Sequence, residues 1–129
     1  MANPTNLKEA NQLRIAVVGP CASGKTTLVR GLRKRGFDAY VVAQEHSAVP
    51  GLWAHQHPDL LIALHADLET IRKRRGPAWS GVIYQAQLER LQQAYEAADL
   101  TIDTSSVRQK AAIAESVKFL ETYVTTGNC

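Results

Sequence analysis

Residues 14–33 read RIAVVGPCASGKTTLVRGLR, and this stretch is the strongest indication of how the 129-residue chain folds. Within it, residues 19–26 match the phosphate-binding pattern G-x-x-x-x-G-K-[ST] at every fixed position. The β-branched run that precedes the match predicts a buried strand, and Leu28 and Leu32 behind it have helical spacing. A strand, a glycine-rich turn and a helix in this order direct backbone N–H groups and a helix N-terminus at one point. The stretch therefore predicts a binding site for a nucleoside diphosphate or triphosphate.

Each residue type in the loop has a chemical reason to be there. Gly19 and Gly24 carry no Cβ, so the backbone can curl around a phosphate. Lys25 places a positive charge against the β- and γ-phosphates, and the Thr26 hydroxyl is offered to Mg²⁺. Thr27 is expected at the α-phosphate. The other predicted nucleotide-binding residues lie between the two glycines: Pro20, Cys21, Ala22 and Ser23. Since no base for a nucleophilic thiol is evident, Cys21 is expected to pack.

Length and composition indicate one domain, residues 13–125, preceded by a polar tail at residues 1–12. No apolar run reaches membrane-spanning length, so a membrane association is not expected. The only two cysteines, Cys21 and Cys129, provide no disulfide framework and favour a cytoplasmic location. The formal net charge of +3 comes from clustered basic residues, but no nucleic-acid motif accompanies them, so a nucleic-acid partner is not expected.

The rest of the chain alternates between predicted strands and helices. Strands are expected at 38–43, 59–65 and 100–103, helices at 67–75 and 82–98, and a final helix opened by a capping box at Ser106–Gln109. Residues 44–58 show no period and contain two prolines, so a long irregular connection is expected there. This order predicts an α/β fold: a parallel sheet of about four strands with helices on both faces and ligands beyond the strands' carboxyl ends.

Three acids follow predicted strands and are candidates to support Mg²⁺ beside Thr26: Glu45, Asp67 and Asp103. Glu45 is favoured because it opens the long connection and can reach both metal and substrate. Asp67 has a competing function as a helix N-cap, and Asp103 closes an outer strand. A solvated loop acid is the simpler reading of Glu45, and His46 beside it is read as polar surface or as a proton acceptor.

The unbroken basic run Arg72-Lys73-Arg74-Arg75 has two interpretations. A guanidinium can neutralise the charge of a transferred phosphoryl group or stack on a nucleotide base. Alternatively, the run is a solvated helix end that complements its own dipole.

Three segments together resemble the P-loop small-molecule and nucleotide kinases, such as the adenylate-kinase-like and shikimate-kinase-like enzymes. These segments are Gly19–Thr26, residues 58–74 (PDLLIALHADLETIRKR) and residues 98–104 (ADLTIDT). The resemblance implies the three-layer P-loop NTPase sandwich, ATP as donor, Mg²⁺, and arginines that contact the nucleotide. By position these arginines are Arg72, Arg74 and Arg75, and Thr104–Ser106 would lie near the adenine.

The activity implied is an ATP-dependent transfer of phosphate to a small metabolite or nucleotide, with Lys25, Glu45, Arg72 and Arg75 as catalytic residues. Kinases of this kind usually have five strands and a longer lid than Gly76–Gly81 supplies. The short acceptor region leaves a second hypothesis open, in which the chain senses nucleotide or hydrolyses ATP slowly without an acceptor. A guanine-specifying N/T-K-x-D segment is absent, which disfavours a GTPase.

Overall fold

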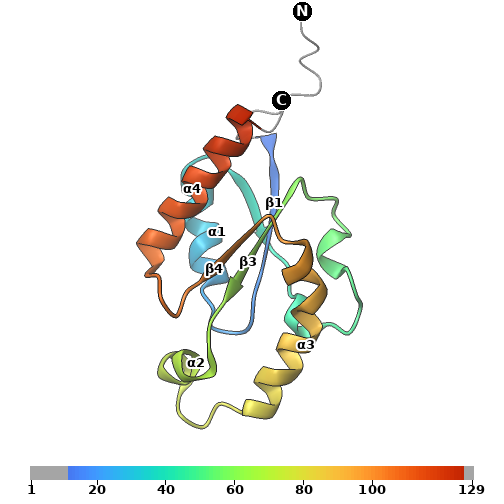
Figure 1. Ribbon diagram of the computed structural model, residues 1–129, viewed down its shortest axis with the longest axis vertical. Helices are drawn as coiled ribbons and strands as arrows, with labels where there is room; N and C mark the ends of the chain where they lie inside the picture. The colour runs from blue at the N-terminus through green and yellow to red at the C-terminus, as the bar shows by residue number, and fades with distance from the viewer. Residues whose placement is uncertain (1–11, 127–129) are drawn as a thin grey trace, which may run out of the picture.

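A four-stranded parallel sheet lies at the centre of the computed structural model, which describes residues 12–126 (Figure 1). The strands are β1 (Arg14–Val18), β2 (Asp38–Val41), β3 (Leu60–His65) and β4 (Leu100–Asp103), in the spatial order β2-β1-β3-β4. The expected parallel α/β architecture is thereby confirmed. The tail expected at residues 1–12 falls outside the described residues except for its last member.

The register of the sheet places β1 and β3 in its interior. Ile15 lies opposite Ala39 of β2 on one side and opposite Leu60 of β3 on the other. The first five residues of β3 are all buried, because an interior parallel strand is covered on both faces. This explains why its sequence, LLIALH, is apolar without alternation.

Helices cover both faces of the sheet. Helices α1 (Lys25–Lys34) and α4 (Gln109–Thr126) pack on one face, where Ile15, Val17 and Ile62 share a core cluster with Leu28 and Leu120. Helix α3 (Gly81–Ala97) packs on the other face, where the side chains from the alternate strand positions meet Leu91 and Ala94. Helix α2 (Leu68–Arg75) follows β3 directly and lies beyond the end of the sheet (Figure 1).

Two details differ from the sequence-based expectations. The connection at residues 44–58 contains two short 3-10 turns, Gln44–His46 and Leu52–Ala54. The capping box predicted at Ser106 is wrong, because α4 begins only at Gln109. The Ser106 hydroxyl donates to the Asp103 carboxylate at 3.2 Å, so it closes the turn after β4 instead of capping a helix.

Candidate functional site

The loop between β1 and α1 is curled by two residues with left-handed backbone conformation. Ala22 has φ 63° and Gly24, the N-cap of α1, has φ 102°. No side chain caps the N-terminus of α1. The first N–H groups of a helix have no partner within it, and the helix dipole is positive at this end. The loop therefore presents donors that suit an anion such as phosphate.

Gly19 is required by the close approach of the loop to β3. A Cβ atom at this position would lie 2.9 Å from the backbone oxygen of Leu64 and 2.5 Å from the hydroxyl of Ser23. Real Cβ atoms do not approach other atoms so closely, and a strand backbone in the sheet interior has little room to shift. The first glycine of the motif thus holds the loop against the end of the neighbouring strand.

Lys25 folds back over the loop and pairs with Glu45. Its Nζ donates to the backbone oxygens of Gly19 (2.8 Å) and Pro20 (3.0 Å) and lies 2.8 Å from Oε2 of Glu45. Both side chains are almost completely buried, with exposures of 10% for Lys25 and 4% for Glu45. The second carboxylate oxygen, Oε1, is buried and has no hydrogen-bond partner within residues 12–126. The carboxylate therefore retains an unused acceptor.

Helix α3 holds the loop and the turn at Gln44–His46 from behind. The buried side chain of Gln87 accepts a hydrogen bond from the Cys21 N–H at 3.0 Å. Arg90, one turn later, donates to the backbone oxygen of Glu45 at 3.1 Å. The hydroxyl of Tyr84 donates to the backbone oxygen of Ala66 at 2.8 Å, and burial raises its pKa, so it stays protonated. Sequence reasoning missed Gln87 and Arg90, although a glutamine within the apolar stripe of α3 was a usable signal.

The other two acids proposed for a metal are engaged elsewhere. Asp67 caps α2 as expected: its carboxylate accepts a hydrogen bond from the Thr70 N–H at 2.8 Å. The Asp103 carboxylate accepts hydrogen bonds from the Ser105 N–H and the Ser106 hydroxyl. Among the three, Glu45 is the acid that lies against the lysine of the loop.

The four basic residues of α2 differ in what they contact. Arg74 donates from Nη1 to the backbone oxygen of Ala22 (2.7 Å) and from Nη2 to that of Thr104 (2.8 Å). It thus ties the loop to the segment that follows β4. Arg72 donates to the backbone oxygen of Trp79, and the Arg75 guanidinium lies 5.4 Å from the Trp79 ring centroid. These two arginines are exposed and do not line the cavity beside the loop, so their catalytic role stays a prediction.

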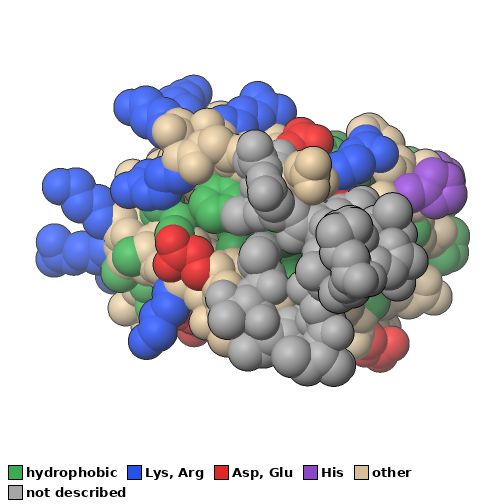
Figure 2. Space-filling model, turned by 90° about the horizontal axis from the view of Figure 1, so that it is seen from above, with side chains coloured by type: hydrophobic (Ala, Val, Ile, Leu, Met, Phe, Trp, Pro, Cys, Tyr) green, Lys and Arg blue, Asp and Glu red, His purple; other side chains and the backbone are tan. Residues whose placement is uncertain are grey.

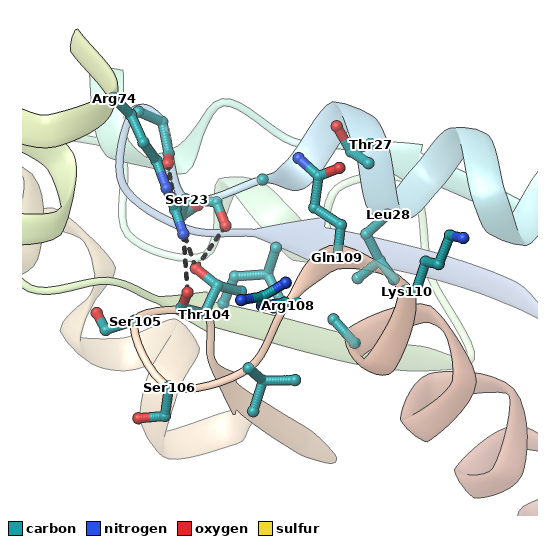
Figure 3. Close-up of a pocket in the computed structure, with 15 residues that line it drawn as sticks. Ser23, Thr27, Leu28, Arg74, Thr104, Ser105, Ser106, Arg108, Gln109 and Lys110 are labelled. Atoms are coloured by element: carbon teal, nitrogen blue, oxygen red, sulfur yellow. Dashed lines mark hydrogen bonds between the residues drawn. The ribbon is translucent and has the colours of Figure 1, made fainter.

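A cavity of about 880 Å³ opens between the loop, the start of α1 and the segment from Thr104 to Lys110 (Figure 3). Three cations line it, Arg74, Arg108 and Lys110, and none of its lining residues is acidic. The Thr104 hydroxyl donates to the backbone oxygen of Ser23 at 2.8 Å, so the far wall is fixed to the loop. The size suits a ligand of nucleotide dimensions, and the charge favours an anionic one.

Of the remaining predicted residues, Pro20 and Cys21 are buried, Thr27 is half-buried and lines the cavity, and Thr26 is exposed at the second position of α1. The structure therefore brings together residues 19–27, Glu45, Arg74 and Thr104–Ser106. The exposed hydroxyl of Thr26 and the carboxylate of Glu45 are hard oxygen donors, which are the ligands that Mg²⁺ prefers.

A second basic region lies away from this site, at the end of α1. Arg30, Arg33, Lys34 and Arg35 are all exposed. Arg33 and Arg35 donate to the backbone oxygens of Ala39 and Gly31, respectively. Figure 2, which shows the molecule from above relative to Figure 1, has Lys and Arg side chains gathered on the side where α1 and α4 lie in Figure 1. Two of these four cations thus have backbone partners.

Comparison with protein-family models and with curated proteins gave no match. Within residues 12–126, every helix is too short or too polar to cross a bilayer. The function of the chain is therefore inferred from the geometry of the site.

Proposed function

We propose that this chain has the P-loop NTPase sandwich and binds ATP at the loop between β1 and α1. The observation that carries the proposal is the curled, glycine-hinged loop at an uncapped helix N-terminus, with Lys25 folded over it. The basic cavity beside the loop supports it independently. In this reading the phosphates lie in the loop and the nucleoside occupies the cavity beside Thr104–Ser106.

Lys25 is the residue whose partners would change on binding. Its ammonium now has two carbonyl oxygens and one carboxylate oxygen as partners. A β- or γ-phosphate oxygen is a charged acceptor and bonds an ammonium more strongly than a carbonyl does. We expect Lys25 to exchange carbonyl partners for phosphate while it stays at the end of the loop.

Mg²⁺ fits the donors in the site, with Thr26 and Glu45 as the residues that would hold it. When bound it neutralises part of the phosphate charge. Lys25 and Arg74, which donate to the backbone oxygens of Gly19 and Ala22, add fixed positive charge at the loop. Phosphoryl transfer depends chiefly on such positioning and charge neutralisation, because little covalent chemistry falls to the protein.

The reaction proposed is transfer of the γ-phosphoryl group of ATP to a small metabolite or nucleotide. Glu45 supports this choice, because a buried carboxylate with an unpaired oxygen is suited to orient an acceptor hydroxyl. Arg72 and Arg75 would take part only if the segment around Trp79 releases them toward the loop.

Two measurements test the proposal. Calorimetry with ATP and Mg²⁺ should show binding that Lys25→Ala weakens strongly, with Lys34→Ala as the control. A screen of small hydroxyl and phosphate acceptors with labelled ATP should then yield a phosphorylated product. Equal binding by the parent and Lys25→Ala would refute the site, and normal binding without any product would refute the transferase activity.

One observation favours a second candidate, nucleotide sensing with slow or no hydrolysis. The Lys25–Glu45 pair joins the loop to the turn that opens the long connection to β3. If phosphate draws Lys25 away from Glu45, the connection loses this tie. Limited proteolysis at residues 44–58 should then differ between ATP, ADP and no nucleotide, and an identical pattern in all three would exclude this candidate.

A further inference from the structure

We propose that Cys21, Glu45 and His46 form a binding site for a divalent transition-metal ion of the Zn²⁺ type, which shares Glu45 with the proposed Mg²⁺ site but differs from it in its sulfur and nitrogen donors. The thiol of Cys21, a carboxylate oxygen of Glu45 and a ring nitrogen of His46 all lie within 4.8 Å of one another. Two of these residues are adjacent in the sequence, whereas Cys21 comes from the phosphate-binding loop. Neighbouring strands β1 and β2 bring the two segments together.

The spacing of the donor atoms is close to that of a filled tetrahedral site. With ordinary Zn²⁺ bond lengths, a sulfur and a nitrogen ligand lie about 3.6 Å apart, and a nitrogen and an oxygen ligand about 3.4 Å apart. Here Cys21 Sγ lies 3.4 Å from His46 Nε2, and His46 Nε2 lies 3.6 Å from Glu45 Oε2. Each of these two distances is within about 0.2 Å of the ideal, and the third pair, the Cys21 thiol and a Glu45 carboxylate oxygen, lies within 4.8 Å.

The carboxylate has capacity for a cation although it already pairs with Lys25. Oε2, the oxygen 3.6 Å from His46, also accepts from Lys25, so an ion bound to it would share it with the ammonium. Oε1 is buried without a hydrogen-bond partner in the described part of the chain and is the second oxygen that the carboxylate can offer. A buried carboxylate oxygen without a partner is costly, and a metal ion would satisfy it. A thiolate and a carboxylate would place two negative charges beside the ion, the second of which also faces the Lys25 ammonium.

Neighbouring groups hold the ligands in place. The Gln87 amide donates to Cys21 Sγ at 3.2 Å and accepts from the Cys21 N–H, so one side chain holds both the sulfur and the backbone of Cys21. Arg90 holds the backbone oxygen of Glu45. Such outer contacts orient metal ligands and raise affinity. The Cys21 sulfur thus contacts both the Gln87 amide and the His46 ring.

The donor set indicates the class of ion. Sulfur and imidazole ligands favour Zn²⁺ and related transition metals over Mg²⁺ and Ca²⁺, which take oxygen ligands. The His46 side chain is 58% exposed, so the cluster is open to solvent on its side. With three protein ligands, the fourth position would be left for water or for an anion.

Cobalt is a suitable probe because a Co²⁺–thiolate bond has a charge-transfer absorption that other Co²⁺ complexes lack. The full chain, reduced and without nucleotide, is titrated with Co²⁺ and then with Zn²⁺ as competitor. We expect one ion per chain, a thiolate band, and displacement by Zn²⁺. We expect His46→Ala to weaken Co²⁺ binding about tenfold or more, because the ion loses one of its ligands.

Matched variants separate this site from other thiols and imidazoles. Cys21→Ser should abolish the thiolate band while circular dichroism shows an intact fold, whereas Cys129→Ser and His55→Ala should bind as the parent does. A parent without a thiolate band, or a band that survives Cys21→Ser, would overturn the proposal, as would unchanged affinity in His46→Ala. Because no nucleotide is present, failure of this site is distinguishable from failure of the proposed ATP site.

Discussion

Removing the charges of Lys25 and Glu45, singly and together, measures how strongly the loop between β1 and α1 is tied to the turn after β2. The variants are Lys25→Met, Glu45→Leu and the double substitution. Methionine and leucine keep apolar volume at the two sites and remove the ionic groups. The pair suits a double-mutant cycle because both side chains are nearly buried and Nζ lies 2.8 Å from Oε2.

The three variants should differ strongly in stability. Lys25→Met leaves a buried carboxylate without its ammonium partner, which costs about 3–5 kcal/mol. Glu45→Leu leaves Lys25 with two carbonyl acceptors. It should therefore cost less, about 1.5–3 kcal/mol, the contribution of a charged hydrogen bond. The double variant leaves no unpaired buried charge. It should lose less than the sum of the two single losses, by a coupling free energy of about 2–3 kcal/mol.

Urea unfolding of nucleotide-free protein, followed by circular dichroism, gives the four free energies of unfolding. As a control, the free energy of unfolding should fall with urea concentration at the same slope in all four proteins. Equal slopes indicate that their unfolded states are comparable. If the single losses add to the double loss within about 0.5 kcal/mol, the two side chains do not interact and the coupling inferred from their contact is wrong.

Three further predictions concern the surroundings of the loop. Gly19→Ala should lower the free energy of unfolding by about 1–3 kcal/mol, because its Cβ meets the Leu64 backbone oxygen at 2.9 Å. As a control in the same urea experiment, Gly81→Ala should not lower the free energy of unfolding, because a Cβ at that position has only ordinary contacts. Arg74→Gln should weaken ATP affinity severalfold in calorimetry, because the loop loses its tie to Thr104, while Lys73→Gln should leave the affinity unchanged. The Thr70 N–H holds the pKa of Asp67 below its usual value, so the carboxylate stabilises the fold above the unfolded pKa and loses this effect as pH falls through the folded pKa. Asp67→Asn should therefore lose less stability than the parent between about pH 6 and pH 3 in pH-dependent urea unfolding, and an identical loss would contradict the assignment.

The strands and helices could be predicted where their patterns are local. The apolar run of β3 and the stripe of α3 are properties of consecutive residues, and the structure places both elements within a residue or two of expectation. The capping box at Ser106 failed because α4 begins only at Gln109, and the Ser106 hydroxyl donates to the carboxylate of Asp103 in the turn before it. Short polar residues have several local partners, and sequence alone does not rank them.

The candidate site could be predicted in part. Glu45 was favoured because it opens the long connection after the predicted strand at 38–43, and the structure places its carboxylate against Lys25. The run at 72–75 did not reveal which arginine contacts the loop, because successive residues of a helix differ in direction by about 100°. Only the packed position of α2 selects Arg74.

The phosphate-binding prediction for the loop rests on the sequence alone, because its glycines, lysine and threonine are recognised by their spacing along one short turn. The parallel α/β arrangement follows from the sequence too, since strands and helices alternate. Tertiary packing was needed to show that Glu45 meets Lys25, that Gln87 supports Cys21, and that His46 lies beside the thiol. These contacts join segments 20 to 66 residues apart, and only the pairing of β1 with β2 and the docking of α3 on the sheet bring them within bonding distance.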